Sequence, residues 1–335
     1  MNRTANSGIR SSDFLKKDAQ TPLHQLFLAA GTPCDIWTNS ESILEAARES
    51  FLPMDELRSA VEFRMRFWVD AEDTSQSPWP KPHVRGLDHL VFAGFDSGSS
   101  ALVDLHTRRI IGRFSSLMGV DRAYWKAVIF PMLLSIVGGS VGIAEMHCAC
   151  VARNQNGLLL AGPSGSGKST LSVALSQEGF GFLSDDRTYC SLREGRLFAW
   201  GLPTRLKLRA DAATWFPELR AQELIDAQNG EQVFRLQPEH RLGLNRIPVC
   251  EPRWLVFLER WQNPELQLSR ISSSAAAEFV QEGLMVELPE AIEKQSGTIA
   301  KLLELPCWLL RYGGQPQVVS SELARHFEVG GAIAP

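Results

Sequence analysis

Residues 158–170 read LLLAGPSGSGKST, and this stretch decides the fold. Within it, residues 162–169 match GxxxxGK[ST], the P-loop or Walker A pattern. An apolar run precedes the loop and a segment of helical pattern, 169–177, follows it. The order strand, glycine-rich loop, helix is typical of α/β nucleotide-binding domains. The sequence therefore predicts an α/β fold with a P-loop core.

The same motif predicts how a nucleoside triphosphate is held. Glycines let the backbone turn successive N–H groups toward phosphate oxygens, and the N-terminus of the next helix adds the positive end of its dipole. Lys168 is expected to bridge the β- and γ-phosphates, and Ser169 to hold Mg²⁺. The residues expected to bind ATP with Mg²⁺ are Gly162, Pro163, Ser164, Gly165, Ser166, Gly167, Lys168, Ser169 and Thr170.

Two carboxylates follow the P-loop helix. The short apolar strand predicted at 180–184 ends in Asp185 and Asp186. In an open parallel sheet, the carboxyl ends of neighbouring strands open on one crevice, so both aspartates are expected to face the γ-phosphate. One can accept a hydroxyl proton while the other supports Mg²⁺. The alternative is that they cap a turn at 187–189; beside a P-loop, we favour catalysis.

Two large classes of P-loop protein do not fit. ABC-type ATPases need an LSGGQ-like segment and an apolar strand ending in Asp-Glu, whereas the nearest candidate, 254–258, is followed by Glu259-Arg260. GTPases need an NKxD-like guanine motif, and the sequence has none.

These residues resemble the HPr serine kinase family, in particular the short HPr-kinase-like proteins found in bacteria beside peptide-modification enzymes. Met146-His147 before the loop and Asp185-Asp186 after its helix stand at the spacings that the family has. The resemblance implies that Asp185 is the general base, Asp186 its metal-side partner, and His147 a residue near the base. The flanking segments 121–134, 148–153 and 305–314 also look like the short kinases.

One family segment is missing. The E-I-R-G-L-G segment, which supplies a metal-side Glu in HPr kinases, has no counterpart, and GLPTRLK at 201–207 stands roughly in its place. The resemblance therefore does not imply that HPr is the substrate or that the protein has the phosphorolysis activity of the family. It does imply phosphoryl transfer.

The chain divides into three predicted parts. Residues 1–20 are polar and read as a disordered tail. Residues 21–115 carry strand patterns at 34–38, 61–69, 89–95, 100–106 and 109–114 and a helix after Ser40, which predicts a smaller α+β domain for substrate or partner recognition. Residues 116–335 are expected to form the HPr-kinase-like domain, with a helix at 121–138, a strand at 145–152, and alternating strands and helices beyond the P-loop.

Other candidate residues have ordinary explanations beside functional ones. His147 is followed by Cys148 and Cys150, but on one strand it points away from both, which argues against zinc. Without the resemblance, His147 reads as a hydrogen-bonded core residue. Arg205, Lys207 and Arg209 alternate with leucines, so a strand there exposes three cations, either as a solvated face or to bind an acidic substrate or phosphate.

Composition limits the partners. The formal net charge is −4, which gives no global argument for nucleic acid or an anionic membrane. The most apolar stretch, 128–144, is short for a membrane span and interrupted by glycines. Six cysteines without a CxxC pair predict reduced thiols and a cytoplasmic protein. The related kinases often assemble, so a homo-oligomer is one alternative.

The sequence thus predicts an ATP-dependent kinase that transfers the γ-phosphoryl group to a hydroxyl, expected to be serine, of a peptide or protein. One alternative is a kinase of small alcohols or sugars. Another is a non-catalytic, nucleotide-gated binding module.

Overall fold

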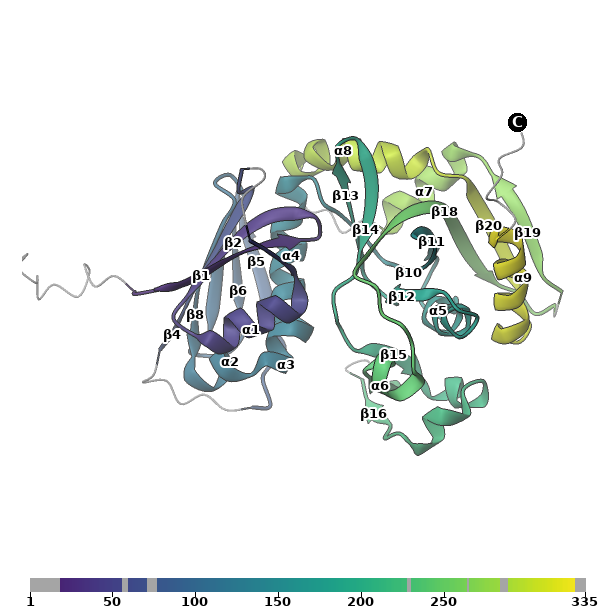
Figure 1. Ribbon diagram of the computed structural model, residues 1–335, viewed down its shortest axis with the longest axis horizontal. Helices are drawn as coiled ribbons and strands as arrows, with labels where there is room; N and C mark the ends of the chain where they lie inside the picture. Colours follow the sequence, from purple (N-terminus) through teal and green to yellow (C-terminus); the bar gives the residue numbers. More distant parts are fainter. Residues whose placement is uncertain are drawn as a thin grey trace, which may run out of the picture.

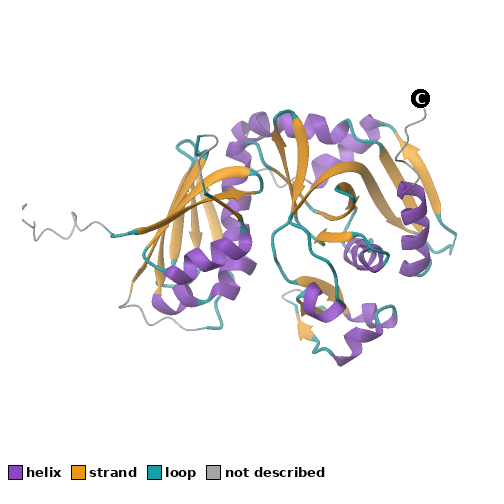
Figure 2. Ribbon diagram, viewed as in Figure 1, coloured by secondary structure: helices purple, strands orange, loops and turns teal. Residues whose placement is uncertain are grey.

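The computed structural model describes residues 19–55, 60–70, 77–227, 230–263, 265–283 and 289–328. The tail predicted at 1–20 lies outside the described residues, apart from its last two positions. The described chain is a mixed α/β structure with an eight-stranded, a nine-stranded and a three-stranded sheet (Figures 1 and 2).

The first sheet has the order β3-β1-β2-β4-β8-β7-β6-β5. Its strands are β1 (Leu23–Ala29), β2 (Thr32–Thr38), β3 (Leu52–Met54), β4 (Phe63–Asp70), β5 (His83–Leu87), β6 (Leu90–Gly94), β7 (Ser100–Asp104) and β8 (Arg109–Ser115). Helix α1 (Glu41–Ser50) begins directly after Ser40. In β4, Phe63, Met65 and Phe67 are buried between exposed arginines, the period-two pattern that the sequence carries. Strands β1, β3 and β5 were not predicted.

A helical run then packs on this first sheet. It consists of α2 (Ser116–Val120), α3 (Arg122–Tyr124), a π-helical turn at Trp125–Ile129, α4 (Phe130–Gly138) and a 3₁₀ turn at Gly139–Val141. The Trp125 ring lies 5.1 Å from that of Phe67 and 4.6 Å from that of Phe114, centroid to centroid. The run after residue 115 therefore shares the aromatic core of the first sheet.

The segment Arg122–Val141 is long and apolar enough to cross a membrane by length and composition alone. Half of it is buried inside the structure, and core helices of folded domains pass the same test.

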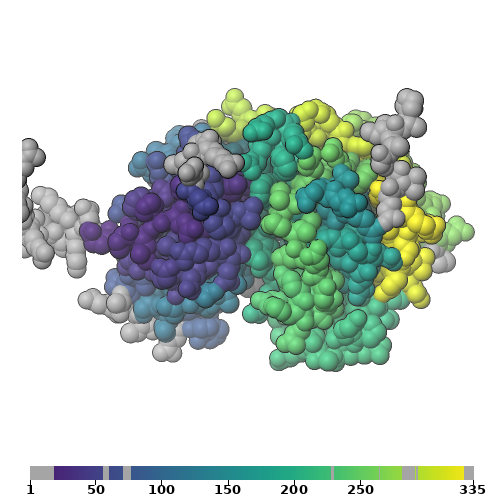
Figure 3. Space-filling model, viewed as in Figure 1, coloured from purple at the N-terminus to yellow at the C-terminus, as the bar shows by residue number. Residues whose placement is uncertain are grey.

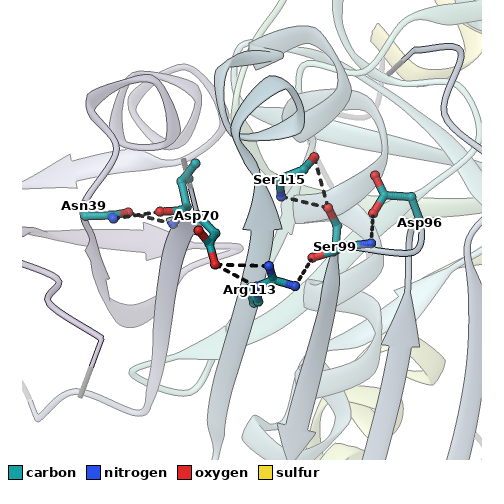
Figure 4. Close-up of polar contacts among 8 residues, drawn as sticks. Asn39, Asp70, Asp96, Ser99, Arg113 and Ser115 are labelled. Carbon is teal, nitrogen blue, oxygen red and sulfur yellow. Dashed lines mark hydrogen bonds and ion pairs between the residues drawn. The ribbon is translucent and has the colours of Figure 1, made fainter. Parts of the chain in front are cut away.

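Polar contacts fix the end of the first sheet where this helical run begins (Figure 4). The Asn39 amide exchanges hydrogen bonds with the backbone of Val69. Arg113 donates to Asp70 at 3.1 Å, joining β8 to β4. Ser115 precedes α2, and its hydroxyl accepts the Met118 N–H as an N-cap.

The second sheet carries the glycine-rich loop. Its order is β12-β10-β11-β18-β14-β13-β9, with β20 also beside β18 and β19 beyond β20. The strands are β9 (Ala144–Met146), β10 (Cys148–Arg153), β11 (Asn156–Ala161), β12 (Gly181–Ser184), β13 (Thr188–Arg193), β14 (Arg196–Trp200), β18 (Val249–Arg260), β19 (Gln267–Ile271) and β20 (Cys307–Tyr312). Helices α5 (Lys168–Gln177) and α9 (Pro316–Glu328) share one apolar core with it, and α7 (Ser273–Gly283) and α8 (Pro289–Leu303) another.

The strand directions correct one expectation. The crevice argument assumed a parallel sheet, but β10 lies between β12 and β11 and runs antiparallel to both. Strands β12 and β11 therefore run in the same direction, and both end at the same edge of the sheet. The carboxyl end of β12 thus meets the edge that carries the glycine-rich loop, although the two strands are not neighbours.

The strand predicted at 145–152 is two strands in the structure. It is interrupted at His147, with β9 paired to β13 and β10 paired to β11 and β12. At 187–189, where the alternative interpretation placed a turn capped by the two aspartates, the chain enters β13 at Thr188.

A third, small sheet lies apart from the main one (Figure 1). Its order is β15-β17-β16, from β15 (Leu206–Arg209), β16 (Ile225–Asp226) and β17 (Gln232–Leu236). It is accompanied by α6 (Pro238–Leu242) and 3₁₀ turns at Ala210–Thr214 and Pro217–Ala221.

Candidate active site

The loop between β11 and α5, residues 162–167, is a bend that only glycine can make at three positions. Gly162, Gly165 and Gly167 have φ of 145°, 82° and 97°. A Cβ on Gly162 would lie 2.7 Å from the Leu258 carbonyl oxygen, and a Cβ on Gly167 would lie 2.1 Å from Tyr312 Oη. Strands β18 and β20 therefore back the loop at close range.

Lys168 folds into this loop. Its Nζ donates to the carbonyl oxygens of Gly162 at 2.7 Å and Pro163 at 3.2 Å. Burial lowers the pKa of this ammonium, and the charge of Asp186 opposes that effect. Ser166 Oγ is also buried, with no hydrogen-bond partner in the described part of the chain. A cation and an unsatisfied hydroxyl enclosed by backbone are a fitting environment for phosphate oxygens.

Asp185 ends β12 and is buried, with 5% of its surface exposed. Its Oδ2 accepts the backbone N–H of Lys207 at 3.1 Å, and its carbonyl oxygen lies 3.5 Å from Ser169 Oγ, at the start of α5. Burial raises the pKa of the carboxyl to about 7, against the opposing effect of the Lys207 N–H. A carboxyl that titrates near neutral pH is suited to general acid–base chemistry.

Asp186 has different surroundings. Its side chain is 57% exposed, and Oδ1 lies 3.2 Å from Nδ1 of His147. His147 occupies the break between β9 and β10, and burial lowers its pKa, against the opposing effect of Asp186. Since its side chain is 43% exposed, His147 is not a core residue.

The structure thus separates the two aspartates while keeping both at the loop. Asp186 faces outward with His147 and lies near enough to Lys168 to influence its charge. Asp185 is buried: its backbone carbonyl oxygen lies near Ser169 Oγ, and its carboxyl accepts the N–H of Lys207 in β15. Pairs of carboxyls whose environments differ in this way are typical of acid–base sites.

Magnesium would find oxygen ligands here. The Ser169 hydroxyl contacts the Asp185 carbonyl, and Asp186 is the next residue along that backbone. Hydroxyl and carboxylate oxygens are what Mg²⁺ prefers. Over the described ranges, no three His, Cys, Asp or Glu residues are grouped so that they could hold a metal ion.

Arg246 is a residue that the sequence did not single out. It donates to the carbonyl oxygens of Leu202 at 3.1 Å and Thr204 at 3.0 Å and pairs with Glu239. Its guanidinium also lies over the ring of Phe182, 5.4 Å from the centroid. Arg246 therefore ties the segment leading into β15 to the strand that ends at Asp185. No local pattern around residue 246 could have indicated this.

Of the three cations at 205–209, Lys207 and Arg209 lie in β15 and Arg205 lies just before it, and all three are exposed. Leu206 and Leu208 are buried between them. Nη1 of Arg209 lies 3.6 Å from where a Cβ on Gly165 would be, and Arg209 pairs with Glu231 at 3.3 Å. The cationic face therefore borders the glycine-rich loop.

Comparisons with known proteins add little. No protein-family profile matches the chain, and neither does any curated protein. Among solved structures, the chain is similar to one titled "Structure of the Hpr(Ser) kinase/phosphatase from Coxiella burnetii". The alignment has 14% identity, covers 56% of this chain and 99% of that chain, and has a TM-score of 0.29. A likeness at that TM-score supports neither a fold nor a function, so the assignment rests on the residues.

Proposed function

We propose that the protein is an ATP-dependent kinase that transfers the γ-phosphoryl group to a hydroxyl, expected to be serine, of a peptide or protein. One observation carries the proposal: Asp185, whose carboxyl has a pKa of about 7, lies at the head of the helix that follows the glycine-rich loop, with its backbone carbonyl oxygen 3.5 Å from Ser169 Oγ. A phosphate loop beside a base poised for neutral pH is the combination that phosphoryl transfer to an alcohol needs.

Each residue has a part in this reaction. The loop amides and Lys168 bind the phosphates, once the lysine exchanges its carbonyl partners for phosphate oxygens. Asp185 takes the proton of the acceptor hydroxyl as its oxygen bonds to the γ-phosphorus, and the bond to the bridging oxygen breaks to release ADP. Ser169 and Asp186 would hold Mg²⁺, which supplies neutralisation of phosphate charge when bound. His147 holds Asp186 from its other side.

The direct test is transfer of label from γ-labelled ATP with Mg²⁺. The acceptors are HPr-like proteins, short serine-ending peptides, and small alcohols including free serine, and the control is Lys168→Ala. We expect label on a peptide or protein serine and none with the control. Label on small alcohols alone would make the protein a metabolite kinase.

A non-catalytic binding module is a second candidate, and the burial of Asp185, 5% exposed, favours it. In that case the nucleotide would act as a switch for partner binding. Tight ATP binding without transfer to any acceptor class would support this reading over the kinase.

We also propose that the protein acts in the cytoplasm. All six cysteines have free thiols, which fits the reducing cytoplasm. Assembly into a homo-oligomer is proposed from the family resemblance alone. Sedimentation velocity measures the oligomeric state.

A further inference from the structure

The loop has a further charged neighbour, Arg260, on the side away from the aspartates. Strand β18 pairs in parallel with β11 on one side and with β20 on the other. The sheet order places β12, with Asp185, beyond the opposite side of β11. The carboxyl end of β18, at Arg260, therefore reaches the same sheet edge as the loop, where ligands of α/β sheets bind.

Arg260 is held against the loop. Its Nε lies 3.9 Å from where a Cβ on Gly167 would be. Its guanidinium lies over the ring of Tyr312, 4.7 Å from the centroid, and Tyr312 Oη donates to the Ser166 carbonyl at 2.6 Å. Because Tyr312 is buried and fixed to the loop, the arginine is oriented before any ligand arrives.

The charge of Arg260 is not engaged by protein. Within the described ranges, its guanidinium makes no ion pair and no hydrogen bond. It makes a cation–π contact with the Tyr312 ring. Two other arginines in this part of the fold differ: Arg311 pairs with Glu259 at 3.1 Å, and Arg209 pairs with Glu231 at 3.3 Å. An exposed, oriented guanidinium keeps its five N–H donors for an anion.

We infer that Arg260 is a further ligand of the nucleotide's phosphate chain, approaching from the side of the loop opposite Asp185. The inference rests on the proposed function only in that both place a triphosphate at the loop. Guanidinium groups bind phosphate through paired, charge-assisted hydrogen bonds. The loop would then hold the triphosphate between cations from two directions, Lys168 within it and Arg260 at its flank.

Isothermal titration of the full chain with three magnesium-bound probes tests this. The probes are ATP, GTP and inorganic tripolyphosphate, and the variants are Arg260→Gln, Arg260→Lys and Arg270→Gln. Arg270 is the matched control because it also lies over an aromatic ring, Trp308 at 5.7 Å, but on β19. Thermal unfolding of each variant checks that it is folded; Arg260 is exposed, so substitution leaves the core intact.

We expect Arg260→Gln to weaken all three probes by a similar factor, roughly 10- to 100-fold, the worth of a hydrogen bond to a charged group. Arg260→Lys should retain part of the affinity, and Arg270→Gln should bind as wild type does. Affinity of Arg260→Gln within about twofold of wild type would overturn the inference. So would a loss seen with ATP but not with tripolyphosphate, because the contact would then be to the nucleoside and not to the phosphates.

These outcomes are separable from the kinase proposal. If affinity depends on Arg260 but no acceptor is labelled, the phosphate contact stands and the kinase proposal fails. If acceptors are labelled while Arg260→Gln binds normally, the reverse holds.

Discussion

Asp185 carries most of the proposed chemistry, and its removal should separate binding from transfer. Asp185→Asn keeps an acceptor for the Lys207 N–H but cannot take a proton. We expect ATP affinity to change little and transfer to fall by ~10²- to 10⁴-fold. Quench-flow with labelled ATP measures transfer, and Asp211→Asn, at an exposed aspartate of the small sheet's lobe, is the control. Full transfer by Asp185→Asn would remove the base assignment.

The same carboxyl predicts how activity depends on pH. Because its pKa is raised to about 7, the basic form is a minority below that pH. Transfer under saturating ATP should therefore rise as the pH increases through about 7 and then level. A pH–rate profile that is flat between 5 and 8 would contradict this assignment.

The free energy of unfolding should instead fall as the pH rises. The folded protein holds the Asp185 proton up to about pH 7, whereas the unfolded chain releases it near the ordinary 3.8. A raised carboxyl pKa means that the stabilising protonated form is lost as pH rises, so wild type loses stability between about pH 4 and 7. The free energy of unfolding of Asp185→Asn should therefore rise relative to that of wild type over this range, by at most roughly 4 kcal/mol. Urea denaturation at several pH values measures the difference, and an unchanging difference would count against the raised pKa.

The sequence indicated the residues of this site better than their environments. The motif at 162–169 and the aspartates after the next strand were predicted, and the structure places them at one sheet edge. The surroundings of Asp185 were not, because the backbone N–H that its carboxyl accepts comes from Lys207, 22 residues further along the chain. Arg260 and Tyr312 were also missed, because only the pairing of β18 with β11, and of β20 with β18, brings them to the loop.

The glycine-rich loop depends on its backing by β20. Gly167→Ala should destabilise the loop for two reasons. The φ of 97° disfavours a side chain, and the new Cβ would lie 2.1 Å from Tyr312 Oη. Gly195→Ala is the matched control, with φ of 74° but nothing within 4 Å. We expect the control to cost about 1–2 kcal/mol of stability and keep ATP binding. Gly167→Ala should cost more and weaken ATP binding by at least about tenfold. Equal effects of the two substitutions on ATP affinity, by calorimetry, would show that the Tyr312 contact is unimportant.

Elements with strong periodicity were predicted and those set by long-range pairing were not. The pattern of β4, with buried residues at every second position, appears directly in the sequence. The break at His147 does not, because β9 leaves the line of β10 to pair with β13. Strand β13 was not predicted, since no local pattern shows that it pairs with both β9 and β14.

The N-terminal sheet and the loop-bearing sheet are joined by a buried contact. Trp200 of β14 is 4% exposed and belongs to the core of the first sheet. Its indole N–H donates to Ser191 Oγ at 3.1 Å, and that hydroxyl donates to the Ala30 carbonyl at 2.9 Å. In Figure 3 the purple and blue surface of the first part adjoins the teal and green surface of the rest. The two parts should therefore unfold together.

Trp200→Ala tests how much this junction contributes to stability. We expect it to cost about 3–5 kcal/mol, because a large buried side chain is replaced by a cavity at the junction. Trp261→Ala, at a side chain that is 38% exposed, should cost less than about 1 kcal/mol. Circular dichroism during urea denaturation measures both. If the two substitutions have similar effects, the junction contributes little to stability.

The most direct measurement for the proposed kinase is a crystal structure with Mg²⁺ and a non-hydrolysable ATP analogue. We predict a triphosphate within residues 162–168, Lys168 moved from the Gly162 carbonyl to the phosphates, and the Asp185 carboxyl opened toward the γ-phosphate. A triphosphate bound elsewhere, or an Asp185 still buried against Lys207 with the nucleotide in place, would contradict the phosphoryl-transfer mechanism.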